Sequence, residues 1–108
     1  MKTSKIDFEV NKGYVAAEIP QEAYPTESIT YSNEKAWMDI LEQRLKDYTN
    51  GEMTVVGVGA GVEWVKVGDT VLTANFCRLE TIYRNIEGFT YPRAFWIFRE
   101  SEILLKSA

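Results

Sequence analysis

Hydrophobic and polar residues alternate with a period of two near the N-terminus, which is the pattern of a β-strand with one buried face. The alternation runs through "IDFEV" (6–10), and "YVAAEI" (14–19) continues as a second extended segment. Asn-Lys-Gly at 11–13 separates the two segments and has the composition of a turn. Pro20 is expected to end the second strand, because proline has no N–H to donate to a neighbouring strand.

One segment has a helical period instead. The apolar residues that share this spacing are Trp37, Ile40, Leu41, Leu45 and Tyr48. They predict a single amphipathic helix over about 34–48. Ser32 or Asn33 can cap its N-terminus, and Gly51 lies where a residue with positive φ often follows a helix. Two partners are open for the apolar stripe: the body of its own domain, or the surface of another protein.

The chain from residue 53 onward is predicted to be mainly β. Three segments are rich in β-branched and aromatic residues and are separated by Gly, Asn and Pro: 53–59, 62–76 and 93–98. Residues 20–52 form a long loop into which the helix is inserted. Short strands in so small a chain favour a barrel or tight sandwich over an open sheet. The whole chain, 1–108, is therefore predicted to be one mainly β domain.

Composition narrows the class of protein. With 108 residues, 45% of them hydrophobic, the chain can bury one modest core. The net charge of −4 and the lack of a basic cluster argue against a nucleic-acid-binding protein. The single cysteine, Cys77, cannot form an internal disulfide, which favours a reducing compartment. No run has the length of a signal peptide or a membrane span, so we expect a cytoplasmic protein that binds no membrane.

The residue types also limit the chemistry. There is no histidine, so the most common general base and the most common transition-metal ligand are missing. Cys77 has no imidazole or second cysteine to activate it, and we interpret it as a packed strand residue. Glu100 and Glu102 alternate as at a solvated strand end, which is more common than an acid/base pair. The sequence therefore predicts no enzyme, no metal site and no cofactor.

Three glycines occupy alternate positions after a β-branched run: Gly57, Gly59 and Gly61. A dinucleotide-binding loop would need a third glycine where Val62 stands, and a helix after it. A phosphate-binding Walker loop would need Ser or Thr after Lys66, where Val67 stands. The glycines are therefore predicted to form a close-packed turn between two strands. A second turn is expected at 67–69.

Three short motifs follow one another along the chain. They are "VVGVG" at Val55–Gly59, "VKVGDTV" at Val65–Val71 and "RESEIL" at Arg99–Leu104. Their order and their distances from the termini resemble those of the GroES family of co-chaperonins. The text "NKGYVAAEI" (11–19) is similar to the opening strand of that family.

The resemblance implies a small, partly open β-barrel that assembles into a ring, usually of seven subunits. Such a ring caps the chamber of a GroEL-type chaperonin in its nucleotide-bound state and so assists protein folding. Each subunit docks through an apolar segment of a mobile loop. By position, that segment here is Ser28, Ile29, Thr30 and Tyr31. Subunit contacts in the family pair the first strand with the neighbour's last strand, which implies an interface of Ile6, Phe8 and Val10 with Ile103, Leu104 and Leu105.

Three departures from the family pattern are visible. Only Ile29 is aliphatic in the docking segment, where the family has three aliphatic residues. The text "AGVEW" (60–64) stands where the family inserts a roof hairpin, and the helix at 34–48 is additional. A long loop combined with a missing roof resembles the phage-encoded co-chaperonins, which would act in the host cytoplasm.

Two other functions remain open. A structural or assembly protein, such as a virion component, would use the stripe of the 34–48 helix as its contact surface. A barrel that binds a small molecule would use its aromatic residues as a pocket lining. The candidates for that lining are Trp64, Phe95, Trp96 and Phe98, although such residues more often form a core.

Overall fold

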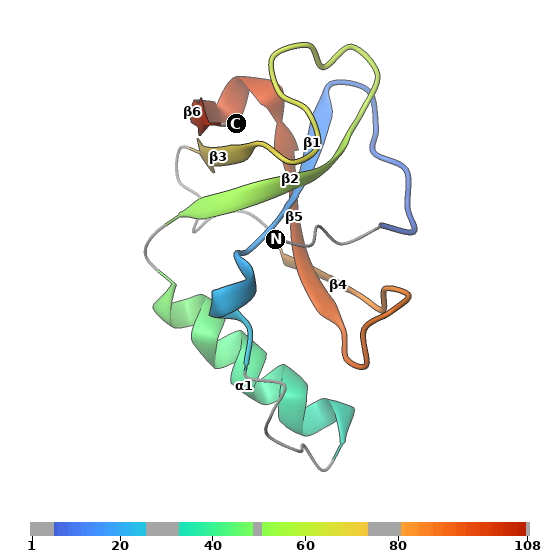
Figure 1. The fold of residues 1–108 in the computed structure, drawn as a ribbon, viewed down its shortest axis with the longest axis vertical. Coiled ribbons are helices and arrows are strands. Elements are labelled where there is room, and N and C mark those ends of the chain that lie inside the picture. Colours follow the sequence, from blue (N-terminus) through green and yellow to red (C-terminus); the bar gives the residue numbers. More distant parts are fainter. Residues whose placement is uncertain (1–5, 26–32, 49–50, 74–80, 108) are drawn as a thin grey trace.

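The predicted β character is confirmed by a computed structural model of the chain, whose described residues form one antiparallel sheet and one α-helix (Figure 1). The structure describes residues 6–25, 33–48, 51–73 and 81–107. The strands are β1 (Tyr14–Glu18), β2 (Glu52–Val58), β3 (Thr70–Thr73), β4 (Thr81–Arg84), β5 (Arg93–Arg99) and β6 (Ile103–Ser107). Within these residues the helical elements are α1 (Glu34–Asp47) and the 3-10 turns η1 (Gln21–Ala23) and η3 (Glu100–Glu102).

The six strands lie in the order β4-β5-β1-β2-β3-β6, and every neighbouring pair is antiparallel. The sheet is strongly twisted, so that β2 and β3 cross the direction of β1 and β5 (Figure 1). Irregular pairing between Ala16 and Ala17, and between Leu72 and Thr73, is of the kind that increases twist. Within the described residues β4 and β6 do not pair, so the sheet is open and closes no barrel. The expectation of a barrel or tight sandwich rather than an open sheet was wrong on this point.

Most of the predicted strands are confirmed, with two exceptions. The segment 6–10 forms no strand and bends at residues 7–8, and residues 62–69 belong to an irregular loop before β3. That loop is tied to β2, because the N–H of Gly68 donates to the carbonyl of Val55 at 2.9 Å. The four residues of β4 were not anticipated, because so short a segment gives little alternation. Cys77 lies outside the described residues.

Helix α1 forms where its apolar period predicts it. The Asn33 side chain caps its first turn by accepting a hydrogen bond from the N–H of Ala36 at 2.9 Å. Tyr48 is the C-cap, so Gly51, with φ of 80°, leads into β2 instead of ending the helix.

The apolar stripe of α1 packs on its own domain. Trp37 and Leu41 are buried in the core, and Leu45 and Tyr48 are half-buried against it. Of the stripe, only Ile40 is exposed, at 40%. The helix therefore leaves little apolar surface for another protein.

Two buried clusters lie on the sheet. The first gathers residues from α1, η1 and most strands, including Trp37, Leu41, Met53, Val55, Val71, Trp96 and Phe98. The second consists of Ala16, Val56, Ile86 and Phe95, with the half-buried Ile6, Phe8, Val10, Phe89 and Ile97 packed against it. The N-terminal segment 6–10 thus covers part of the sheet, and a Cβ added to Gly57 would lie 2.5 Å from Ile6 Cδ1.

Candidate functional site

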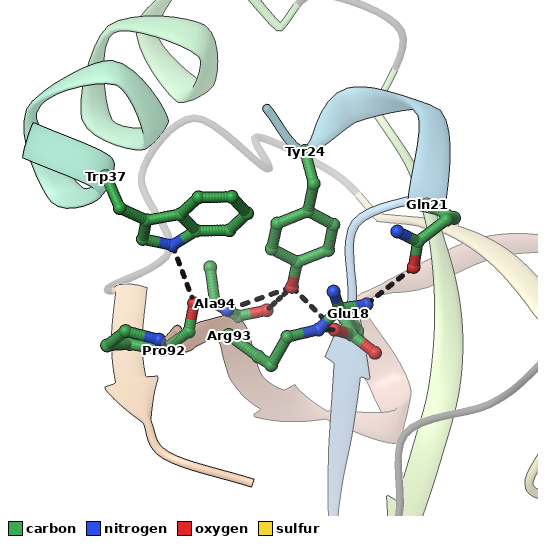
Figure 2. Close-up of polar contacts among 7 residues, drawn as sticks. All are labelled: Glu18, Gln21, Tyr24, Trp37, Pro92, Arg93 and Ala94. Carbon is green, nitrogen blue, oxygen red and sulfur yellow. Dashed lines mark hydrogen bonds and ion pairs between the residues drawn. The ribbon is translucent and has the colours of Figure 1, made fainter. Parts of the chain in front are cut away.

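The predicted docking segment, Ser28 to Tyr31, lies outside the described residues. Both flanks of the connection that contains it, 26–32, are described. Tyr24 precedes this connection, and Trp37 in the first turns of α1 follows it. Both side chains are buried; Tyr24 is hydrogen-bonded to Ala94 of β5, and Trp37 to Pro92, which directly precedes β5 (Figure 2).

The hydroxyl of Tyr24 is held on two sides. It accepts a hydrogen bond from the N–H of Ala94 at 2.9 Å and donates to Glu18 Oε2 at 2.5 Å. Residue 94 belongs to β5 and residue 18 to β1, which are neighbours in the sheet. One side chain therefore ties the turn at 21–24 to two strands at once.

Arg93 completes this cluster. Its Nε donates to Glu18 Oε2 at 2.8 Å, and its Nη2 donates to Gln21 Oε1 at 2.7 Å. The guanidinium lies between two aromatic rings, 3.8 Å from the ring centroid of Tyr24 and 4.0 Å from that of Phe89. Nη1 has no hydrogen-bond partner among the described residues, and its stacking between rings suits the weakly hydrated guanidinium.

Trp37 provides the second attachment. Its Nε1 donates to the backbone carbonyl of Pro92 at 3.0 Å. Its indole stacks on Tyr91 with a centroid separation of 4.8 Å and on Tyr24 with a separation of 6.4 Å. The two flanks of the connection thus touch each other and the same short stretch of chain, Pro92–Ala94 (Figure 2).

Burial determines the protonation of Tyr24. Desolvation raises the pKa of its hydroxyl well above the usual value, and the nearby Glu18 carboxylate raises it further. The opposing effect of Arg93 is smaller. Tyr24 therefore keeps its proton at physiological pH and remains a donor to Glu18.

The predicted subunit interface divides into two parts. Ile103 is buried, whereas Leu104 and Leu105 are 64% and 58% exposed. All three belong to β6, which pairs with β3 on one side and is an edge of the sheet on the other, within the described residues. An edge strand carries unpaired N–H and C=O groups that can pair with another chain.

The other half of that interface has a role inside the chain. Ile6, Phe8 and Val10 are half-buried and face the second cluster, where Phe8 meets Phe95 edge-on at a centroid distance of 5.6 Å. They do not form the predicted strand. The structure brings them to the sheet surface and not to β6, and their pairing with a neighbouring subunit stays a prediction.

The remaining candidates are placed as follows. Phe95, Trp96 and Phe98 are core residues, and Trp64 is partly exposed on the loop before β3. In the part of the chain that the structure describes, no group of three His, Cys, Asp or Glu side chains could hold a metal ion. No helix in the same residues is long and apolar enough to cross a membrane.

Sequence reasoning missed the Glu18–Arg93–Tyr24 cluster. Its one local signal is Glu18, a single acidic residue in the otherwise apolar strand "YVAAEI". Its partner Arg93 is 75 positions away and could not be paired with it from the sequence. No family model, curated protein or solved structure matches the chain.

Proposed function

We propose that this protein is a co-chaperonin subunit of the GroES type, similar to those encoded by phages. Its copies would assemble into a ring, with seven as the family number, and the ring would cap a nucleotide-bound GroEL-type chaperonin. It would act in the cytoplasm, which is the host cytoplasm for a phage protein. The proposal assigns no catalytic residue, metal or cofactor.

The observation that carries the proposal is the exposed edge of β6. Leu104 and Leu105 are the two most exposed large hydrophobic residues described, and they lie on an edge strand at the position of the family's subunit contact. Such an edge in a free monomer would invite aggregation. Covering it with a neighbouring subunit removes both the open edge and the exposed leucines.

The second support is the arrangement around the docking segment. The resemblance puts the docking loop between the first strand and the "VVGVG" strand, and these are β1 and β2. The segment follows the buried Tyr24 and Pro25, and the helix that precedes β2 is packed on the sheet. With one aliphatic residue, Ile29, each docking contact is expected to be weak. Several tethered copies would bind together through their high effective concentration.

The alternative is an assembly protein that uses α1 as its contact surface. Because Trp37 and Leu41 are buried in the chain's own core, this hypothesis has only Ile40 left as an exposed apolar anchor. The described residues of α1 give it no larger apolar surface. We therefore favour the co-chaperonin.

The test is ATP-dependent binding to a GroEL-type chaperonin, measured by sedimentation velocity. The wild-type ring is expected to cosediment with the chaperonin when ATP is present. Ile29→Glu is expected to abolish binding while the ring keeps its mass. Ile40→Glu is the matched control, since it adds the same charge at an exposed isoleucine of α1 and is expected to bind normally. Loss of assembly in Ile40→Glu, with no response to chaperonin or ATP in the wild type, would instead support the assembly protein.

A further inference from the structure

The two most exposed large hydrophobic side chains described, Leu104 and Leu105, and an apolar groove at the end of β2 lie on different sides of the molecule. We propose that in the assembled protein the leucines of one copy insert into the groove of the next copy. This inference names the surface that receives the β6 edge, so it rests on the ring of the proposed function. It requires neither a chaperonin nor strand pairing by residues 6–10.

The groove lies between the N-terminal segment and the last residues of β2. It has a volume of about 300 Å³ and is lined by Ile6, Phe8, Glu9, Val10 and residues 57–60. The segment 6–10 packs closely on the sheet here because residue 57 is a glycine: a Cβ at this position would stand 2.5 Å from Ile6 Cδ1 and 3.1 Å from Val10 Cγ2. Val58 lines the groove and is 37% exposed, although β2 is a central strand. The groove therefore leaves apolar surface in solvent that a second apolar surface can cover.

Leu104 and Leu105 form the projecting half of the contact. They belong to β6, which has no neighbour on its outer side among the described residues. The register of β6 on β3 is irregular at this point: Leu105 pairs with Leu72 and Ile103 with Thr73, so that Leu104 is an extra residue. An irregularity of this kind redirects side chains and interrupts the flat edge that a neighbouring strand needs. Insertion of side chains therefore suits this edge better than continuous strand pairing.

The two halves are too far apart to meet within one chain. In Figure 1, β6 lies at the left of the view, whereas the N-terminal segment that lines the groove, in dark blue, lies at the right. A pair of copies joined in this way still has one groove and one pair of leucines free. Such a head-to-tail contact continues from copy to copy and closes into a ring when the rotation between neighbours allows it.

The charges beside the two surfaces are complementary. Glu9 lines the groove, is exposed and has no ion pair among the described residues. Lys106 directly follows the two leucines; its ammonium donates to the carbonyl of Trp64 at 2.7 Å and lies 3.9 Å from Asp69 Oδ2. An ammonium has three N–H donors, so one is left for a partner. Attraction to Glu9 favours this orientation over one in which two β6 edges, each with its Lys106, face each other.

The experiment measures native mass by light scattering after size-exclusion chromatography, at a concentration at which the wild type is fully assembled. The groove variant is Val58→Glu. Val67→Glu is the matched control, because it adds the same charge at an exposed valine that does not line the groove. The leucine variant combines Leu104→Glu with Leu105→Glu. The groove variant and the leucine variant are measured alone and as an equimolar mixture.

We expect each of these two variants alone to be a monomer of 12.4 kDa, because each lacks one half of the contact. Their mixture is expected to form pairs of twice that mass, since the groove variant keeps its leucines and the leucine variant keeps its groove. Val67→Glu is expected to assemble like the wild type. Val58→Thr, which introduces no charge, is expected to raise the protein concentration needed for half-assembly by ~3-fold or more.

The inference is overturned if Val58→Glu keeps the wild-type mass, if Val67→Glu loses assembly equally, or if the mixture stays monomeric. Pairs formed by the groove variant alone would also overturn it, because they would show that β6 contacts β6 of a second copy. If Val58→Glu does not fold, Val58→Thr decides: assembly at the wild-type concentration contradicts the contact.

Failure of the proposed function looks different. A wild type that assembles, and whose variants behave as expected, but that binds no GroEL-type chaperonin with ATP would contradict the co-chaperonin and support this contact. A wild type that assembles together with an equally assembled Val58→Glu would contradict the contact alone. A monomeric wild type would contradict both.

Discussion

The carbonyl oxygen of Asn11 lies 1.8 Å from the point where a Cβ of residue 59 would stand, so Gly59 is packed directly against the backbone of the N-terminal turn. Two hydrogen bonds fix this approach. The N–H of Gly59 donates to the carbonyl of Tyr14, and the N–H of Gly13 donates to the carbonyl of Ala60, both at 2.9 Å. This contact explains Gly59 in the "VGVGAG" run without a phosphate ligand. A side chain at this position would clash with the backbone of Asn11.

Gly59→Ala is predicted to destabilise the protein by about 3 kcal/mol or more, because two backbone segments must separate to admit one methyl group. Urea unfolding of the variant measures the loss. Gly13→Ala is the control, since nothing lies within 4 Å of its added Cβ and only its positive φ of 79° is unfavourable. It is expected to cost about 1 kcal/mol. Equal losses in the two variants would contradict the close-packing explanation.

The raised pKa of Tyr24 predicts a loss of stability in alkali. Above pH 10 the unfolded chain releases the tyrosine proton while the folded chain retains it, so the unfolded state binds fewer protons and the free energy of unfolding falls with pH. By pH 11 this group contributes a loss of about 1.4 kcal/mol. Tyr24→Phe removes the contribution, and the pH dependence of unfolding in the wild type and the variant is expected to diverge only above pH 10. Parallel curves would show that Tyr24 is not shielded from ionisation.

The Glu18–Arg93 ion pair predicts a strongly asymmetric mutational response. Arg93→Met leaves the carboxylate of Glu18 buried without its cation, and is expected to cost about 3–5 kcal/mol. Adding Glu18→Gln to that variant is expected to recover part of the loss, because no buried charge remains. Denaturant unfolding measures both. If Glu18→Gln recovers none of the stability that Arg93→Met loses, then the packing of the guanidinium, and not its charge, accounts for that loss.

Arg84→Met is the surface control for this prediction. Arg84 and Asp7 form an ion pair at 3.5 Å in which both side chains are about half exposed. Solvent screens such a pair, so its removal is expected to change the free energy of unfolding by less than about 1 kcal/mol.

The β6 edge predicts a variant that separates assembly from folding. Leu104→Glu combined with Leu105→Glu places two charges on the open edge, and is expected to prevent assembly of the proposed ring. The unfolding midpoint of the monomer is expected to change little, since both side chains are exposed. Ile82→Glu, at an exposed residue of the other edge strand β4, is the control and is expected to leave assembly intact. An unchanged native mass in the double variant would contradict the assignment of β6.

Local patterns in the sequence predict the local structure well. The apolar stripe that includes Trp37 and Leu41 predicts the bounds of α1 to within one residue. Asn33 caps the helix as expected, and Pro20 follows the end of β1. Each of these signals is satisfied within a few residues by the chain's own geometry. The same holds for the turn at Gly68.

Two strand predictions were wrong because the structure of those segments depends on residues far away in the sequence. The alternation in 6–10 marks a half-buried face, but the segment packs on the second cluster and forms no strand. The β-branched run at 62–69 has strand propensity, yet side chains from elsewhere hold its backbone: Glu100 accepts the N–H of Trp64, and Lys106 donates to its carbonyl. Tertiary hydrogen bonds therefore override propensity in that loop.

The candidate site was predicted only in part. The interface role of Leu104 and Leu105 stays a prediction from the family resemblance, whereas the Glu18–Arg93–Tyr24 cluster requires Arg93 to meet Glu18 across the sheet. No sequence pattern pairs those two residues. The sheet order, with β1 beside β5, is what brings them together.

The native mass of the purified protein tests the central claim most directly. Seven chains of 12.4 kDa would form a ring of about 87 kDa, which light scattering after size-exclusion chromatography resolves easily from smaller species. We predict a single species near that mass. A stable monomer of 12.4 kDa would contradict the account, because an unpaired β6 edge would then be compatible with a soluble, solitary chain.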